Sequence, residues 1–217
     1  MQKIGFCDNF SLTQAVLNGT KTMTRRVEKG LENLQEGNFY FNQATCEIYL
    51  YGEKGTIIER IKTRYKLGEV VAVAQSYKDA RIDPHYLMFA TVKEKFSCVE
   101  KEIIAMDTKG WSNKMFVRAD LMPHQIQITG VRIERLQDIT DEDCLKEGVY
   151  YDADVDGYKV YNLTLPNKGF KGDCFRQKYF KTPREAFAAI INRPGVGRKG
   201  LWESNPFVVV YQFKLVK

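Results

Sequence analysis

The sequence predicts a mixed α+β fold, in which a small β-barrel carries short helices at its openings. Several short segments have the alternating or valine-rich composition of strands, whereas only three short segments begin and end like helices. The chain has 217 residues, of which 44% are hydrophobic. It is therefore long enough for one large domain or two small ones with a sizeable core.

The three helix signals lie far apart in the chain. Residues 11–18 have an apolar face and are followed by a glycine, which favours a helix end. A capping-box-like start predicts a helix over residues 141–147 that stops at Gly148. The third helix starts with the capping sequence Thr-Pro-Arg-Glu at residues 182–185 and ends before Pro194.

The strand signals are more numerous. Residues 47–50 and 56–61 predict a hairpin around the turn Gly-Glu-Lys-Gly. Residues 69–74 are rich in valine, residues 85–96 add a weaker strand signal, and residues 207–216 alternate apolar side chains on one face.

Residues 125–136 give the clearest strand signal. Ile126 and Ile128 share one parity, whereas Val131 and Ile133 share the other. Because the switch falls at a glycine, we predict a β-bulge there that turns the second half of the strand. Residues 150–181 lack periodicity and are interpreted as an insertion.

Composition narrows the class of protein. No apolar run approaches the ~20 residues of a membrane helix, and the opening MQKIGFCDNF lacks the features of a signal peptide. We therefore expect a cytoplasmic protein.

Five widely spread cysteines without a C-x-x-C motif and only two histidines argue against a disulfide framework and a metal site. We expect no cofactor.

Positive charge is concentrated near the end of the chain. Residues 168–217 contain 11 Lys and Arg against 3 acidic residues, a net charge of 11 − 3 = +8, so the remaining residues carry +6 − 8 = −2. Such an excess favours an anionic partner, first of all nucleic acid. An ordinary basic surface explains the charge equally well.

The sequence Gly-Val-Gly-Arg-Lys-Gly at residues 195–200 matches G-x-G-x-x-G. It follows a predicted helix instead of a strand, which is the wrong context for a dinucleotide-binding fold. We interpret it as a basic loop, in which backbone amides with Arg198 and Lys199 form an alternative phosphate grip.

Residues 20–26 (TKTMTRR) collect cations and hydroxyl groups directly after the first predicted helix. A partly desolvated Lys21 near Arg25 and Arg26 would lose its proton more readily, and a neutral amine could activate the hydroxyl of Thr24. A phosphate-binding or simply solvated loop is the alternative.

This stretch, with Gly19, Lys21, Thr24 and Arg26 in the order G-x-K-x-x-T-x-R, resembles the signature of the ASCH domain in the PUA-like superfamily. Other pieces follow in family order, namely GEVV at residues 68–71, the segment 126–148 and NPFV at residues 205–208. Threonine at the fourth motif position resembles the bacterial N(4)-acetylcytidine amidohydrolases.

The resemblance implies a single ASCH domain over residues 1–217, a PUA-like mixed β-barrel with short flanking helices and insertions near 30–66, 78–115 and 150–181. It implies that Lys21, Thr24 and Glu147 act together on an N-acetylated cytosine nucleoside.

Two further arguments concern this site. The negative end of the predicted helix 141–147 would raise the pKa of Glu147, which suits proton exchange. Arg26 or Arg25 would hold an oxyanion or a polar base edge.

Two other functions remain open. A binding module would grip RNA or a modified nucleotide without chemistry, with Arg193, Arg198 and Lys199 extending the basic track and Trp111 and Trp202 stacking on bases. A ribonuclease would need a general base, for which His124 is the one attractive candidate, although an ordinary surface histidine explains it as well.

Overall fold

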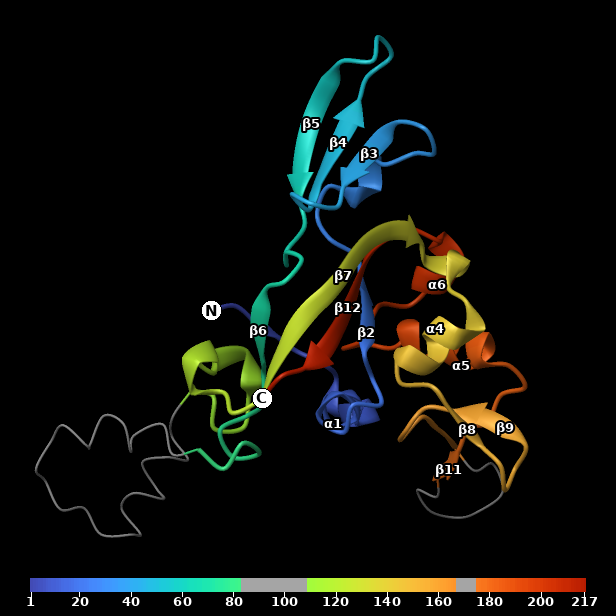
Figure 1. The fold of residues 1–217 in the computed structure, drawn as a ribbon. Helices are drawn as coiled ribbons and strands as arrows, with labels where there is room; N and C mark the ends of the chain where they lie inside the picture. The colour runs from blue at the N-terminus through green and yellow to red at the C-terminus, as the bar shows by residue number, and fades with distance from the viewer. Residues whose placement is uncertain (83–108, 167–174) are drawn as a thin grey trace, which may run out of the picture. The chain divides into compact units, whose positions relative to one another are not determined.

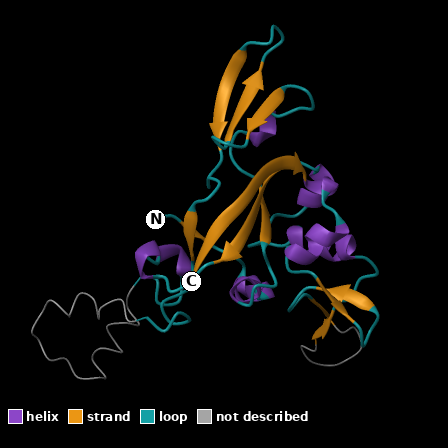
Figure 2. Cartoon of the chain, viewed as in Figure 1, coloured by secondary structure: helices purple, strands orange, loops and turns teal. Residues whose placement is uncertain are grey.

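The computed structural model describes residues 1–82, 109–166 and 175–217. They belong to two compact units. Unit 1 comprises residues 1–6, 70–126 and 215–217, and unit 2 comprises residues 7–69 and 127–214. Strands outnumber helices, and every helix is short (Figures 1 and 2).

Unit 2 is built on strands β7 (Gln125–Arg135), β12 (Phe207–Leu215) and β2 (Met23–Arg26), which are neighbours in that order (Figure 1). Strands β12 and β2 are antiparallel, with Tyr211 opposite Thr24 and Val210 opposite Arg25. The first five residues of β12 are all buried, so both faces of this part of the strand are covered. The strand predicted over residues 207–216 is thus confirmed, whereas its one-sided alternation is wrong for the first five residues.

The helices of unit 2 follow their local signals closely. Helix α1 (Leu12–Leu17) precedes β2, helix α4 (Asp141–Lys146) follows β7, and α5 (Pro183–Ile191) and α6 (Leu201–Ser204) precede β12. The hydroxyl groups of Thr140 and Thr182 accept the predicted capping hydrogen bonds from the third backbone amide that follows each of them. The chain leaves α4 through Gly148, whose φ of +103° favours glycine.

A three-stranded antiparallel sheet confirms the predicted hairpin and adds one strand to it. Its order is β3 (Phe39–Asn42), β4 (Glu47–Tyr51) and β5 (Ile57–Lys62). The turn between β4 and β5 is closed by the amide of Gly55 bonding to the carbonyl of Gly52 at 2.9 Å. One face of this sheet is buried at Ile48, Leu50 and Ile61.

The predicted insertion contains short strands. Strands β8 (Tyr150–Asp152) and β9 (Gly157–Lys159) form one antiparallel pair, and β10 (Thr164–Pro166) and β11 (Phe175–Gln177) form another. Single three-residue strands are too short to show periodicity in the sequence.

Unit 1 is smaller. Strand β1 (Lys3–Ile4) runs parallel to β6 (Val70–Val73), with Ile4 opposite Val73. Two 3₁₀ turns at Lys114–Phe116 and Ala119–Leu121 accompany these strands. A cluster of five buried residues forms its core, namely Ala72, Ala74, Tyr77, Val117 and Met122.

The predicted mixed α+β class is confirmed. The strands of the described ranges do not close into a barrel. Along β7 the buried positions switch parity from Ile128 to Val131, as expected, while the β-bulge at Gly130 remains a prediction. The strand predicted over residues 85–96 lies outside the described residues. No helix in the described part of the chain is long and apolar enough to cross a membrane.

Gly197 of the G-x-G-x-x-G sequence has a packing role. A Cβ atom there would lie 2.0 Å from the backbone oxygen of Ile191 and 2.8 Å from a methyl group of Leu201. Residues 195–200 therefore form the turn that connects α5 to α6, and Gly197 allows the two helices to approach closely there. The close backbone approach accounts for Gly197, and the positive φ values of Gly195 (+86°) and Gly200 (+77°) account for the other two glycines.

We predict that Gly197→Ala lowers the free energy of unfolding by roughly 3 kcal/mol, because the new methyl group overlaps rigid backbone. Gly200→Ala is the matched control, because a Cβ atom at Gly200 meets nothing within 4 Å and only its φ of +77° is strained. Its cost should stay near ~1 kcal/mol. Urea unfolding monitored by circular dichroism measures both values, and equal losses would contradict the steric role of Gly197.

Candidate functional site

The site is organised around a buried pair formed by Lys21 and Glu147. Lys21 lies just before β2, and Glu147 caps the end of α4. The amine of Lys21 donates to the carboxylate Oε2 of Glu147 at 2.6 Å and to its backbone carbonyl at 2.7 Å. Lys21 is 2% exposed and Glu147 is 7% exposed. The amide of Thr22 bonds to the carbonyl of Lys146 at 3.0 Å, which holds the two segments together.

Arg25 joins this pair to two further carboxylates. Its Nη1 donates to Glu147 Oε1 at 3.2 Å, and its Nη2 donates to Asp143 Oδ2 at 2.9 Å. Its Nε and Nη2 donate to Glu134 Oε1 at 2.9 and 2.7 Å. The guanidinium also lies 6.0 Å from the centre of the Phe187 ring. Arg25 is thus engaged by the protein itself, so it is poorly placed to hold an oxyanion.

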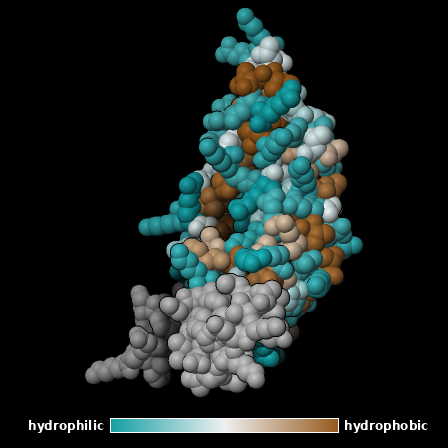
Figure 3. Space-filling view, turned by 90° about the vertical axis from the view of Figure 1, so that its left-hand side faces the viewer, coloured by the Kyte–Doolittle hydropathy of each residue, from teal (hydrophilic) through white to brown (hydrophobic). Residues whose placement is uncertain are grey.

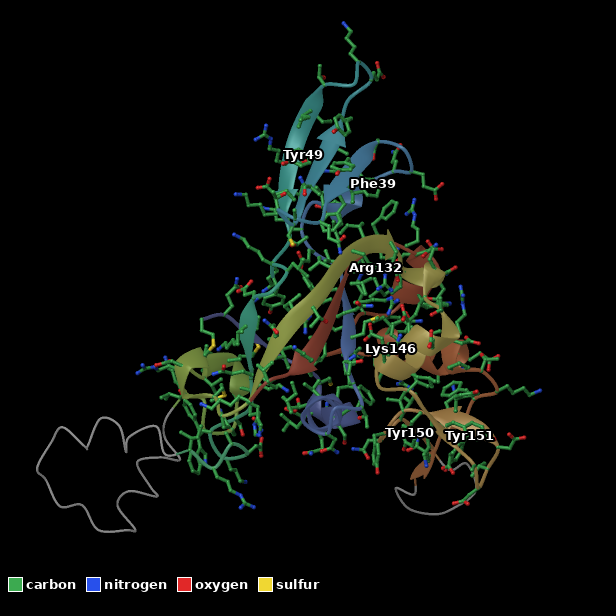
Figure 4. All side chains as sticks on the ribbon, in the orientation of Figure 1. Phe39, Tyr49, Arg132, Lys146, Tyr150 and Tyr151 are labelled. Carbon is green, nitrogen blue, oxygen red and sulfur yellow. The ribbon has the colours of Figure 1, made fainter. Side chains whose placement is uncertain are left out.

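Arg132 extends the network to its solvent side. Its Nε donates to Glu134 Oε2 at 2.7 Å, and its Nη2 donates to the same Asp143 oxygen that Arg25 contacts. Lys146 lies 3.5 Å from the other oxygen of Asp143. Figure 4 shows Arg132 on β7 and Lys146 at the end of α4. We refer to the residues Lys21, Arg25, Arg132, Glu134, Asp143 and Glu147 as the ionic network.

Burial changes the proton affinity of these groups. Desolvation lowers the pKa of Lys21 from its ordinary value, although the carboxylate of Glu147 acts in the opposite direction. The positive charges of Arg26 and Arg25 lower it further. Burial alone would raise the pKa of Asp143, but the hydrogen bonds and charges of Arg25 and Arg132 outweigh it and lower the pKa.

Thr24 occupies the other face of β2. Successive side chains of a strand point to opposite faces, so Thr24 and Arg26 lie opposite Arg25. Thr24 pairs with Tyr211 across the sheet and is 7% exposed. Its hydroxyl makes no hydrogen bond with any described residue. The structure thus brings Lys21 and Glu147 together, whereas among the described residues no hydrogen bond links Thr24 to either of them.

The Thr24 face carries its own polar cluster. The hydroxyl of Tyr211 donates to Glu28 Oε1 at 2.6 Å and accepts from the amide of Tyr65 at 3.3 Å. Burial raises the pKa of Glu28 and lowers the pKa of Arg26. The charge of Arg26 also interacts with Glu147 and with Lys21. Arg26 therefore couples the two faces of β2 electrostatically.

The predicted basic track lies elsewhere on unit 2. Arg193, Arg198 and Lys199 are exposed in the segment between α5 and α6, and none of them has a hydrogen bond or ion pair to the ionic network. Trp202 packs edge-on against Phe187, with their centroids 6.1 Å apart, and has a guanidinium, that of Arg184, over its ring. Trp202 thus already has intramolecular partners.

In unit 1, Trp111 packs partly buried against the core cluster. His124 Nδ1 lies 2.7 Å from Gln75 Oε1, so this ring nitrogen is hydrogen-bonded to an amide side chain. Both Trp111 and His124 therefore already have partners within the protein.

Arg132, Glu134 and Asp143 were not among the residues predicted for the site. The spacing of these residues in the sequence does give two signals for them. Arg132 and Glu134 are two positions apart on a predicted strand and therefore share a face, and Asp143 and Glu147 are four positions apart on a predicted helix. Neither signal identifies Arg25 as the common partner, because that pairing joins three separate elements.

Comparison with known proteins identifies no relative. No protein-family model matches the chain, and neither a curated protein nor a solved structure matches it. The resemblance to ASCH domains therefore rests on the motifs alone. In the described residues, no cluster of three His, Cys, Asp or Glu side chains could hold a metal ion.

We predict that Glu147→Gln lowers the free energy of unfolding by about 3 kcal/mol, because it leaves the buried charges of Lys21 and Arg25 incompletely compensated. Glu142→Gln on the same helix is the control, since Glu142 is exposed and should cost less than ~1 kcal/mol. Chemical denaturation at pH 7 measures both. Similar losses for the two variants would show that the Lys21–Glu147 pair contributes little.

A second prediction concerns the pH dependence of stability. Because the folded-state pKa of Lys21 lies below its ordinary value of 10.5, the unfolded chain binds the extra proton between these two values. The contribution of Lys21 to stability therefore rises with pH in this window, by at most ~1.4 kcal/mol per pH unit. The free energy of unfolding of the wild type, measured relative to Lys21→Met, should increase towards pH 10.5. A constant or falling difference would contradict a lowered pKa.

Proposed function

We propose that this protein hydrolyses the acyl amide of an N-acylated cytosine nucleoside, free or within RNA, with N(4)-acetylcytidine as the simplest substrate. The observation that carries the proposal is the buried Lys21–Glu147 pair, in which the lysine has a lowered pKa and immediately precedes the strand that bears Thr24. The proposal includes the PUA-like fold and the cytoplasmic location that the sequence predicts.

In the proposed reaction the hydroxyl oxygen of Thr24 attacks the acetyl carbonyl carbon, and its proton passes to the amine of Lys21, whose lowered pKa favours the neutral form that can accept it. Collapse of the tetrahedral intermediate breaks the bond between the carbonyl carbon and N4, and the departing amine takes up the proton. Water then hydrolyses the acetyl ester on Thr24, so that cytidine and acetate are released. Glu147 orients Lys21 and relays the proton.

Arg26 is the better candidate for the oxyanion. Arg25 already donates to three carboxylates, whereas Arg26 shares the face of β2 that carries Thr24. The mechanism requires Thr24 and Lys21 to come within hydrogen-bonding reach in the substrate complex, where catalytic hydrogen bonds shorten.

A non-catalytic binding module is the second candidate. It is favoured by the engagement of the Lys21 amine, which donates to two oxygens of Glu147 and is almost fully buried. In this case the ionic network is structural, and RNA or a modified nucleotide binds through exposed cations such as Arg193, Arg198 and Lys199.

Incubation with N(4)-acetylcytidine and chromatographic detection of cytidine tests the first proposal. The wild type should release cytidine, and Thr24→Ala should lower the rate at least ~100-fold. Thr20→Ala is the matched control, because Thr20 belongs to the same segment, is exposed and should leave the rate unchanged. No release by the wild type, where an authentic amidohydrolase is active, would exclude the reaction. RNA affinity that falls steeply with salt in that case would support the binding module.

A further inference from the structure

The three-stranded sheet β3–β4–β5 has one face on which aromatic and cationic side chains stand in register. Its other face is the buried one, with Ile48, Leu50 and Ile61. On the opposite face, Tyr40 pairs with Tyr49, and Tyr49 pairs with Arg60. These three residues therefore form one row across all three strands, which we call the Tyr–Tyr–Arg row.

The side chains of this row are stacked on one another. The rings of Tyr40 and Tyr49 are 27° from parallel, with centroids 6.4 Å apart. The guanidinium of Arg60 lies 5.6 Å from the centre of the Tyr49 ring. Tyr40 is 56% exposed although it is a large aromatic residue. Figure 4 shows Tyr49 on this sheet, and the space-filling view in Figure 3 shows hydrophobic residues interspersed with hydrophilic ones on the face that it displays.

The charges beside the row favour an anionic partner. Glu47 accepts a hydrogen bond from the Tyr49 hydroxyl at 2.9 Å and lies 3.3 Å from the amine of Lys62. Its negative charge is therefore compensated locally. Arg60 is exposed and forms no ion pair with a described residue, and the Lys62 side chain is 75% exposed. Arg60, Lys62 and Glu47 together carry a net charge of +1, and Lys62 is the partner of Glu47, so Arg60 supplies the excess positive charge.

We propose that the Tyr–Tyr–Arg row is a stacking surface for the bases of single-stranded RNA. Flat aromatic rings and a guanidinium plane offer stacking partners to unpaired bases, and the neighbouring cations attract the phosphates. Tyrosine and arginine are also common at protein interfaces, but cations beside flat aromatic rings are the combination that binds both the phosphates and the bases of a single strand. The proposal does not depend on amide hydrolysis, because it concerns a different surface and is tested by binding alone.

The test is a fluorescence-anisotropy titration of the full chain with a labelled 12-nucleotide oligouridine at low and physiological salt. The wild type should bind, and Tyr40→Ala should weaken binding about 5- to 150-fold, which corresponds to the ~1–3 kcal/mol of one stacked base. Arg60→Ala should weaken binding by at least about fivefold. Tyr40→Phe keeps the ring and should retain the wild-type affinity.

Tyr151→Ala is the matched control, since Tyr151 is also an exposed strand tyrosine, 49% exposed, but lies on β8. It should bind like the wild type. Because Tyr40 is exposed, its replacement should leave the far-ultraviolet circular dichroism spectrum unchanged. The proposal is overturned if the wild type does not bind, if Tyr40→Ala and Arg60→Ala bind as tightly as the wild type, or if duplex RNA binds as tightly as the single strand.

Discussion

The guanidinium of Arg25 is the interaction on which the site depends. It is almost fully buried, and it donates to carboxylates that come from β7, from α4 and from the residue that caps α4. A charge removed from water must be compensated, so each carboxylate is tied to the position of Arg25. The elements that carry them, β2, β7 and α4, are therefore held in one arrangement.

The same burial has consequences for chemistry. Lys21 is positioned by Glu147, which Arg25 also contacts, and its removal from water lowers its pKa. A buried lysine in an ion pair can stabilise the fold as a charge or accept a proton as a base. Both roles require the same contact between Lys21 and Glu147. What separates them is whether Thr24, which lies on the opposite face of β2 from Arg25, reaches the amine when a substrate is present.

Unit 2 separates these buried groups from its exposed ones. The ionic network is closed around its own charges, while the stacked row on the three-stranded sheet leaves aromatic faces and a guanidinium open to solvent. The G-x-G-x-x-G sequence belongs neither to the ionic network nor to the stacked row. Its central glycine, Gly197, is required because the backbone of the preceding helix lies too close for a side chain. A glycine pattern in a sequence therefore needs its structural context before it is assigned to a ligand.

Short-range sequence patterns specify the local features of the fold. The capping residues Thr140 and Thr182, the ends of α4 and α5 and the hairpin of β4 and β5 were all predictable, because neighbouring residues decide them. Long-range packing, in contrast, buries both faces of β12 and surrounds Arg25 with carboxylates, so that it does not face a ligand. Those facts depend on pairing between residues more than 100 positions apart, which no local pattern specifies.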